Sequence, residues 1–258
     1  MKLGRLFNRE SGRAFITAFD HGVTIGAPAG GEDAIGVVRT IVEGCRPDAV
    51  LLGPGLLALT SHLFAFRGAP APIVRADWIQ NDPRLFALGL PEAYRVVCTP
   101  RHAAELGADA FIMFLILGPE SGEQFADNVR AVAKAAEEAH QVGLPLIVEA
   151  VLWGSRIEAK KDPELLAYAC RTAAELGADA IKTEWTGDRA SMAQVIAVCP
   201  TPVLVLGGAK SPDPNAVLQA TRDAMAAGAR GVVYGRNVWQ ADDPVGIASG
   251  LRDIIHGS

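Results

Sequence analysis

One octapeptide, Ala-Ala-Glu-Leu-Gly-Ala-Asp-Ala, occurs twice in the chain, at Ala103–Ala110 and at Ala173–Ala180. In each copy a helix-forming stretch ends in glycine, a residue that readily adopts the left-handed conformation that closes a helix. An apolar stretch follows at once, so a helix leads into a strand within a few residues. The same type of junction recurs at EGCRPDAVLLG, VGLPLIVEA and AGARGVVYG. A chain built from this repeated unit alternates helices with parallel strands.

Eight apolar runs of strand length occur along the chain, and helical segments with apolar residues at three- and four-residue spacing follow most of them. The runs are Ala14–Phe19, Asp48–Leu52, Pro72–Ala76, Asp109–Leu115, Pro145–Val151, Asp179–Glu184, Pro202–Leu206 and Gly231–Gly235. Runs that are apolar on both faces suit parallel strands covered by helices, and eight such strands close a barrel. We therefore expect a single-domain (βα)8 TIM barrel over residues 1–258, with an open doubly wound sheet as the competing fold.

The longer and less regular stretch Asp77–Leu90 is predicted to be a loop inserted after the third strand. Two roles for it stay open. It is either a lid that sets substrate specificity or an insertion used for packing between subunits.

The composition excludes several classes of partner. The formal net charge is −5 with acidic and basic residues mixed, so no basic stripe is available for nucleic acid. No apolar run approaches the ~18 residues of a membrane span, and the N-terminus lacks the apolar core of a signal peptide, which predicts a cytoplasmic protein.

The five histidines are scattered singly, so we expect no metal and no cofactor. The cysteines are expected to be free thiols in a reducing compartment: Cys45, Cys98, Cys170 and Cys199.

Polar residues gather at the carboxyl ends of the predicted strands, where barrels of this kind place their functional groups. After the second octapeptide, Lys182 stands where Ile112 stands after the first. Strand alternation places Ala180, Lys182 and Glu184 on one side, so an inward Ala180 implies an inward lysine. A desolvated lysine can lose its proton and form a Schiff base with a ketone or aldehyde. Alternatively, Lys182 is tilted outward or is neutralised by Glu184 or Glu149.

The last two predicted strands end in glycine-bearing turns. Gly207 and Gly208 precede Lys210 after the seventh strand, and Gly235 precedes Arg236 after the eighth. Glycine lets backbone N–H groups approach an anion closely, and the basic side chains can supply charge, which predicts a site for an anionic group such as phosphate. In the alternative interpretation the glycines only form tight turns and the basic side chains pair with nearby aspartates. Those aspartates are Asp213 and Asp242.

The first predicted strand ends in Asp20-His21-Gly22. A carboxylate at this place can orient substrate hydroxyls or move protons. We count Asp20 among the candidate catalytic residues and His21 among the candidate substrate-binding residues. The alternative role for Asp20 is to cap the helix that follows.

Taken together, these strand ends resemble the archaeal-type class I fructose-bisphosphate aldolase family, within the DeoC/LacD-like aldolase superfamily. The family also includes aminodideoxyheptulosonate synthases and an autoinducer-processing thiolase. The resemblance covers nearly the whole chain, and its four motifs, FDHG, IKTEWTGD, LGGAK and GVVYGRN, occur in the family's order. It implies that Lys182 is the Schiff-base lysine, that Asp20 is an acid/base or substrate-orienting carboxylate, and that the protein is a homo-oligomer. It also implies that the substrate phosphate is bound by Gly207, Gly208, Gly235 and Arg236.

One departure from the family pattern concerns proton transfer. The family's aldolases carry Trp-x-Tyr-Pro-Arg-Gly at the end of the fifth strand, and their tyrosine moves a proton. Here Val151 stands in the place of that tyrosine and cannot do so. Glu149 shares a strand face with Val151 and is the nearest titratable candidate, as a general base or as an ion-pair partner of Lys182 or Lys210. No tyrosine of the chain lies at the end of the fifth strand; the three are Tyr94, Tyr168 and Tyr234.

These observations favour a Schiff-base aldolase that cleaves or forms a carbon–carbon bond in a small phosphorylated keto compound. A second hypothesis keeps the lysine but transfers an acyl or ketol group, as in the thiolase branch. A third hypothesis is a barrel that binds a sugar phosphate without turnover, with the missing tyrosine as a sign of lost chemistry.

Overall fold

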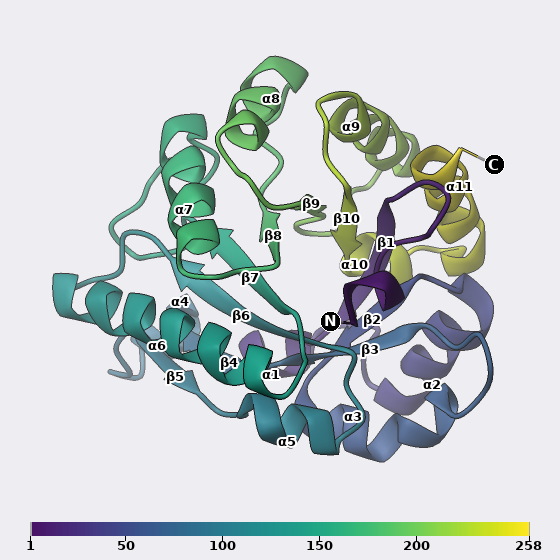
Figure 1. The fold of residues 1–258 in the computed structure, drawn as a ribbon, viewed down its shortest axis with the longest axis horizontal. Helices are drawn as coiled ribbons and strands as arrows, with labels where there is room; N and C mark the ends of the chain where they lie inside the picture. The colour runs from purple at the N-terminus through teal and green to yellow at the C-terminus, as the bar shows by residue number, and fades with distance from the viewer. Residues whose placement is uncertain (1, 258) are drawn as a thin grey trace.

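The computed structural model describes residues 2–257 and shows a closed barrel of eight parallel strands (Figure 1). In their order around the barrel the strands are β1 (Ala14–Phe19), β2 (Ala49–Leu52), β3 (Ala71–Arg75), β6 (Ala110–Ile116), β7 (Leu146–Val151), β8 (Ala180–Thr183), β9 (Val203–Leu206) and β10 (Gly231–Tyr234). Strand β10 pairs with β1 and closes the barrel. The predicted (βα)8 barrel is therefore confirmed, and the open sheet, which would leave two edge strands unpaired, is excluded. Each predicted run coincides with one of these strands, with ends that agree to within one residue.

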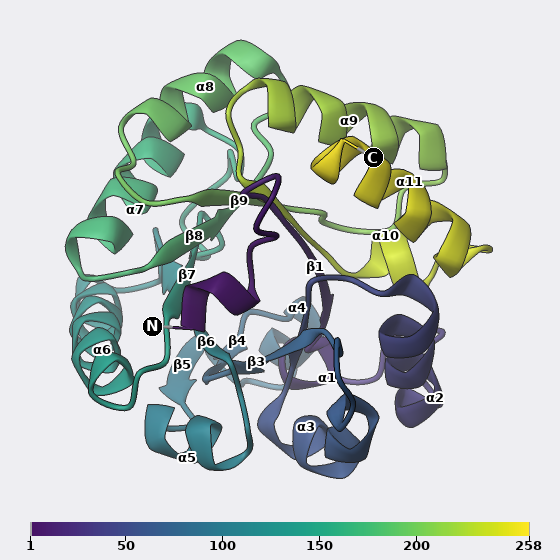
Figure 2. The ribbon, with the colours of Figure 1, turned by 45° about the vertical axis from the view of Figure 1, so that its right-hand side comes forward.

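Helices surround the strands, as the two views in Figures 1 and 2 show. The helices between barrel strands are α2 (Ala34–Arg39) continued by the π-helix η2 (Thr40–Cys45), α3 (Pro54–Thr60) continued by η3 (Ser61–Phe64), α5 (Pro100–Glu105), α6 (Gly122–Gln141), α7 (Pro163–Glu175), α8 (Arg189–Ala197), α9 (Pro214–Ala226) and, after β10, α11 (Pro244–His256). Shorter helices are η1 (Lys2–Arg5), α1 (His21–Thr24), α4 (Pro83–Phe86) and α10 (Arg236–Trp239).

Helix starts and ends follow the local sequence. Asp162 caps α7 by accepting hydrogen bonds from the backbone N–H groups of Glu164 and Leu165, both at 3.0 Å, with proline at the first helical position. Such a cap contributes about 1 kcal/mol to helix stability. Both octapeptide copies form the predicted junction, because α5 and α7 are each followed, after one leucine, by a glycine with positive φ: Gly107 at +82° and Gly177 at +102°. Strands β6 and β8 then begin at the last alanine of each copy.

The apolar core has two layers. The larger layer lies between the strands and the surrounding helices, and the smaller one fills the barrel lumen. The lumen residues are Ala14, Ile16, Ala18, Ala49, Leu51, Ala71, Ile73, Ala110, Ile112, Ile147, Ala180, Leu204 and Val233. Leu6 is fully buried against this layer, with Leu3 and Phe7 packed beside it, so the N-terminal segment closes the amino end of the barrel. The opposite, carboxyl end stays available for a site.

The segment after β3 differs from the predicted irregular loop at Asp77–Leu90. It forms a two-stranded antiparallel sheet of β4 (Asp77–Gln80) and β5 (Ala93–Val96), with α4 between the two strands. Each strand is only four residues long, and aspartate, asparagine, proline and glycine separate them, so the alternation was too short to identify. Ile79 of β4 is buried in an apolar cluster with Phe114 of β6, which ties this sheet to the barrel.

Candidate active site

A pocket of about 630 Å³ opens at the carboxyl ends of the barrel strands. Residues that follow or end β1, β3, β7, β8, β9 and β10 line it, together with parts of the inserted sheet. Its polar and charged lining residues are Asp20, His21, Thr24, Arg75, Asn81, Glu149, Lys182 and Arg236, and the backbones of Gly207, Gly208 and Gly235 complete it. The sequence had assigned most of these residues to a site, and the pocket brings them together.

Lys182 projects into the barrel lumen near the end of β8. Ala180, two residues earlier, belongs to the lumen cluster, whereas the intervening Ile181 packs in the outer layer. The lysine side chain is 7% exposed, and its Nζ lies 2.7 Å from Oε1 of Glu149. The inward orientation predicted from strand alternation is therefore observed, and the lysine has a carboxylate partner.

Glu149 is positioned by the register between β7 and β8, in which it lies directly opposite Lys182. Of the partners that the sequence left open, the structure selects Lys182 rather than Lys210. Glu184, the other carboxylate considered for the lysine, instead accepts a hydrogen bond from Nε1 of Trp153 at 3.0 Å. Burial raises the pKa of Glu184 above its usual range, against the opposing effect of that hydrogen bond.

Asp20 lies immediately after β1 and is also buried. Its Oδ2 is 2.8 Å from Nε of Arg75. Burial alone would raise the pKa of Asp20, but Arg75, Lys182 and His21 outweigh that effect and lower it to about 2. The carboxylate is thus ionised at neutral pH and can accept hydrogen bonds. Asp20 makes no side-chain cap to the helix that follows, so the capping alternative is not what the structure shows.

Arg75 and Asp77 are two buried charged residues that the sequence analysis did not single out. The Arg75 guanidinium contacts the carboxylates of Asp77, at 3.4 Å, and of Glu149, besides that of Asp20. Asp77 accepts a hydrogen bond from the backbone N–H of Phe114 at 2.6 Å. Burial raises the pKa of Asp77 to about 6, even though Arg75 acts to lower it. Strand alternation could have identified Arg75, because it follows the inward residues Ala71 and Ile73 at the same spacing that identified Lys182.

The turns after β9 and β10 require glycine, because neighbouring side chains lie too close to leave room for a Cβ atom. A Cβ at Gly207 would lie 2.8 Å from the ring of Tyr234, and a Cβ at Gly235 would lie 2.5 Å from the ring of His21. The loops are held together by Asn237, whose Nδ2 donates to the Gly207 carbonyl at 2.7 Å and whose Oδ1 accepts from the Ser211 N–H at 2.8 Å. Asn237 follows the predicted Gly-Arg pair and is a positioning residue that the sequence analysis did not single out.

Two buried nitrogens on this side of the pocket have no hydrogen-bond partner within the described residues. They are Nδ1 of His21 and Nε of Arg236. Burial lowers the pKa of His21, with Asp20 opposing the effect, and burial also lowers the pKa of Arg236. An unsatisfied buried polar atom costs about 1–3 kcal/mol, so a ligand with polar atoms would be stabilised beside these two nitrogens.

Lys210 does not join the pocket. Its Nζ lies 3.3 Å from Oδ1 of Asp242, and the side chain is 44% exposed. It lines a separate surface groove between α9 and α11. The interpretation in which this lysine pairs with a nearby aspartate is therefore the one that the structure shows.

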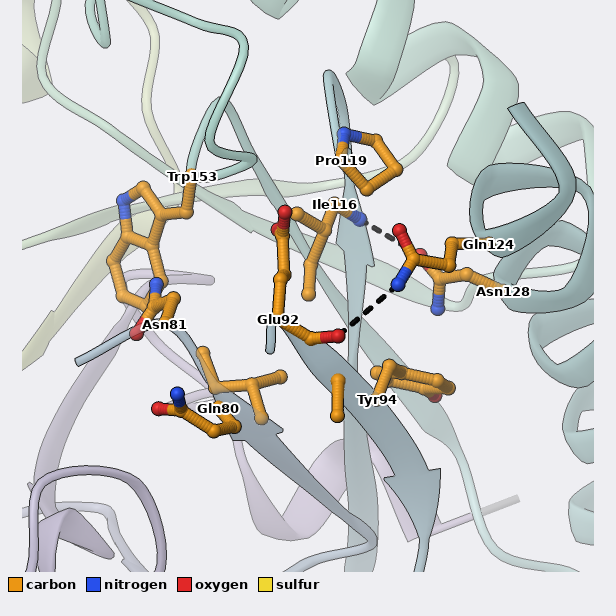
Figure 3. Close-up of a pocket in the computed structure, with 11 residues that line it drawn as sticks. Gln80, Asn81, Glu92, Tyr94, Ile116, Pro119, Gln124, Asn128 and Trp153 are labelled. Atoms are coloured by element: carbon orange, nitrogen blue, oxygen red, sulfur yellow. Dashed lines mark hydrogen bonds between the residues drawn. The ribbon is translucent and has the colours of Figure 1, made fainter. Parts of the chain in front are cut away.

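Val151 is fully buried in an apolar cluster and does not line the pocket. None of the tyrosines lines it either. Tyr94 lies in a smaller adjoining pocket of about 370 Å³, where Figure 3 shows it across from Trp153 and Asn81. Trp153 and Asn81 line both pockets. The Tyr94 hydroxyl is buried without a well-formed hydrogen bond, and burial raises its pKa.

Residues 2–257 contain no cluster of three or more His, Cys, Asp or Glu side chains that could hold a metal ion. Among the helices that the structure describes, none is long and apolar enough to cross a membrane.

A closed parallel barrel with a buried lysine and a paired carboxylate inside its carboxyl-terminal mouth is the arrangement of a Schiff-base, class I carbon–carbon lyase. The sequence profile of the DeoC/LacD family aldolases matches residues 14–241. Since this match covers most of the chain, the protein belongs to the DeoC/LacD aldolase family.

Relatives and solved structures agree with this assignment. The chain is 33% identical to an uncharacterized aldolase of Saccharolobus solfataricus, over 99% of this chain and 93% of the relative. It is 31% identical to the 2-amino-4,5-dihydroxy-6-oxo-7-(phosphonooxy)heptanoate synthase of Streptomyces griseus, over 100% of this chain and 90% of the relative. An archaeal fructose-1,6-bisphosphate aldolase, solved with its catalytic lysine covalently bound to the carbinolamine intermediate of its substrate, superposes with a TM-score of 0.84. It is 28% identical, and the match covers 99% of this chain and 98% of that chain.

Proposed function

We propose that this aldolase acts on a small phosphorylated keto compound, with Lys182 as the Schiff-base lysine. The observation that carries the proposal is the composition of one pocket. It holds a buried amine beside a carboxylate, and in the same cavity it holds two buried nitrogens without partners, on His21 and Arg236. The amine suits a carbonyl carbon and the unpartnered nitrogens suit an anion. The names of the Streptomyces synthase and of the archaeal aldolase also specify phosphorylated compounds.

In the proposed first stage, the Lys182 ammonium passes a proton to Glu149, whose Oε1 is 2.7 Å away. The free amine attacks the carbonyl carbon, and a proton moves from nitrogen to oxygen to give a carbinolamine. Glu149 then returns its proton to the carbinolamine hydroxyl, which leaves as water. The product is an iminium, and Glu149 is again a carboxylate.

In the proposed second stage, Asp20 accepts the proton of the substrate hydroxyl that lies on the carbon β to the iminium. The bond between this β carbon and the α carbon next to the iminium breaks, its electrons pass through the α carbon to the iminium nitrogen, and an aldehyde and an enamine form. Asp20 then protonates the enamine carbon, and hydrolysis releases the ketone and regenerates Lys182. Asp20 is ionised at neutral pH, as a proton acceptor must be, and it lines the same pocket as Lys182.

Substitution of Arg236 by alanine tests the anion site. We expect the KM for a phosphorylated substrate to rise about 10- to 100-fold, because a charge-assisted hydrogen bond is lost. The kcat should change little, since Lys182 and Glu149 keep their ion pair in this variant. Steady-state kinetics measure both constants. The exposed Arg222→Ala on α9 is the matched control and should behave as wild type. An unchanged KM in Arg236→Ala would remove the residue from the anion site.

We further propose that the protein works in the cytoplasm as an assembly of identical subunits. Its free cysteines support a reducing compartment. Exposed apolar side chains in and just after the segment from β4 to β5 support self-association. These residues are Phe86, Leu88, Leu90, Val96 and Val97. Light scattering coupled to size-exclusion chromatography should give a mass that is a multiple of 27.1 kDa. A single-subunit mass at micromolar concentration would contradict the assembly.

A further inference from the structure

Arg75 occupies the centre of the buried charge network and has no role in the proton transfers proposed above. It is the last residue of β3, its side chain is 1% exposed, and it points into the lumen. Each of its three side-chain nitrogens contacts a different carboxylate: Nε meets Asp20, Nη1 meets Asp77, and Nη2 meets Glu149. The guanidinium plane also lies over the Phe114 ring, 3.9 Å from its centroid. Carboxylates therefore surround the edge of the guanidinium group, and the Phe114 ring packs against its face.

The contact with Glu149 has a consequence for Lys182. The terminal torsion of a free glutamate is broad, so a lone carboxylate has no fixed direction. Here Nη2 of Arg75 takes Oε2, which leaves Oε1 directed at the lysine amine. The lysine therefore faces an oxygen whose position is fixed from the opposite side.

The contact with Asp20 acts in the same way. Arg75 holds Oδ2 of Asp20 and leaves the other oxygen of this pocket-lining carboxylate uncommitted to the guanidinium. One guanidinium thus orients two carboxylates that reach it from β1 and β7. A planar fork can hold several acceptors at once, whereas the compact ammonium of a lysine cannot reproduce that geometry.

We propose that Arg75 is a positioning residue that orients Glu149 toward Lys182 and Asp20 toward the substrate. The inference rests on the proposed Schiff-base function and adds a residue to it. Three carboxylates contact Arg75, those of Asp20 after β1, Asp77 at the start of β4 and Glu149 on β7. Lys182 on β8 contacts Glu149. His21 and Arg236 line the same pocket.

The test compares Arg75→Lys and Arg75→Met with wild type, using dihydroxyacetone phosphate as the probe and borohydride to trap the adduct. Mass spectrometry of the Lys182 peptide gives the adduct-forming rate against probe concentration, and circular dichroism with thermal melting reports folding. Arg101→Lys and Arg101→Met are matched controls, since Arg101 is 84% exposed on α5.

In folded Arg75 variants we expect the rate at saturating probe to fall about 10- to 100-fold, the loss that small misplacement of reacting groups produces. The half-saturating probe concentration should stay within about twofold of wild type, because the described contacts of Arg75 are with Asp20, Asp77 and Glu149 and not with the groups proposed to bind the anion. A purely structural role would leave the rate of the folded fraction unchanged.

Folded variants that form the adduct at the wild-type rate would overturn the inference, and so would variants that fail to fold, because Arg75 would then serve folding alone. A wild-type protein without any Lys182 adduct would instead overturn the proposed function itself. The two failures are therefore distinguishable.

Discussion

Replacing Lys182 with methionine should reduce carbon–carbon bond cleavage on the order of 10⁴-fold or more, the scale of loss when a covalent nucleophile is removed. Methionine has a similar length and no amine, so the carbonyl carbon loses its attacking group. The fold should persist, because Glu149 keeps its ion pair with Arg75 after the lysine is gone. Turnover of phosphorylated ketoses and circular dichroism measure the two effects.

Lys134→Met is the matched control for this prediction. Lys134 is 73% exposed on α6 and pairs only with Glu138, four residues away, among the ion pairs described. Its substitution should leave turnover and folding unchanged. Substantial turnover in a folded Lys182→Met variant would contradict the assignment of the nucleophile.

Replacing Glu149 with glutamine should have the second largest effect. Glutamine keeps the shape of the side chain but cannot accept the lysine proton, so we expect kcat to fall about 10²- to 10⁴-fold. The change also removes the carboxylate that lies between two buried cations, Lys182 and Arg75. Breaking a buried ion pair in this way should lower the free energy of unfolding by about 3–5 kcal/mol.

Enzyme kinetics and urea denaturation measure these two changes in Glu149→Gln. Glu105→Gln is the control, since Glu105 is 60% exposed on α5. A Glu149→Gln variant with wild-type kcat would show that another group takes the lysine proton. A variant with wild-type unfolding free energy would show that the buried cations do not depend on this carboxylate.

The fold was predictable because its signal is local and repeated. A glycine that follows a helix, or an apolar run of strand length, can be recognised from a few neighbouring residues. Eight such helix–strand units in one chain are compatible with few folds besides the barrel. Lys182 was identified by the same kind of local signal, through its spacing from Ala180. The inserted sheet was missed because its strands are four residues long, too short for alternation to stand out.

The charge network could be predicted only in part, because it depends on strand register. Arg75 lies 55 residues from Asp20 and 74 from Glu149 along the chain, and only the closed barrel brings the three together. The position of Lys210, outside the pocket that holds Lys182, could not be predicted for a related reason. The turn after β9 leads it away from the pocket and toward Asp242, and residue type alone does not specify that direction.

The most direct test of the central claim is borohydride reduction of the wild-type protein in the presence of phosphorylated ketoses, followed by peptide mass spectrometry. The account predicts a stable adduct on the peptide that contains Lys182, with the mass of the ketose less water plus two hydrogens. The adduct should be absent from Lys182→Met and present in Lys134→Met. No adduct with any of a panel of phosphorylated ketoses, or an adduct confined to other lysines, would contradict a Schiff base at Lys182.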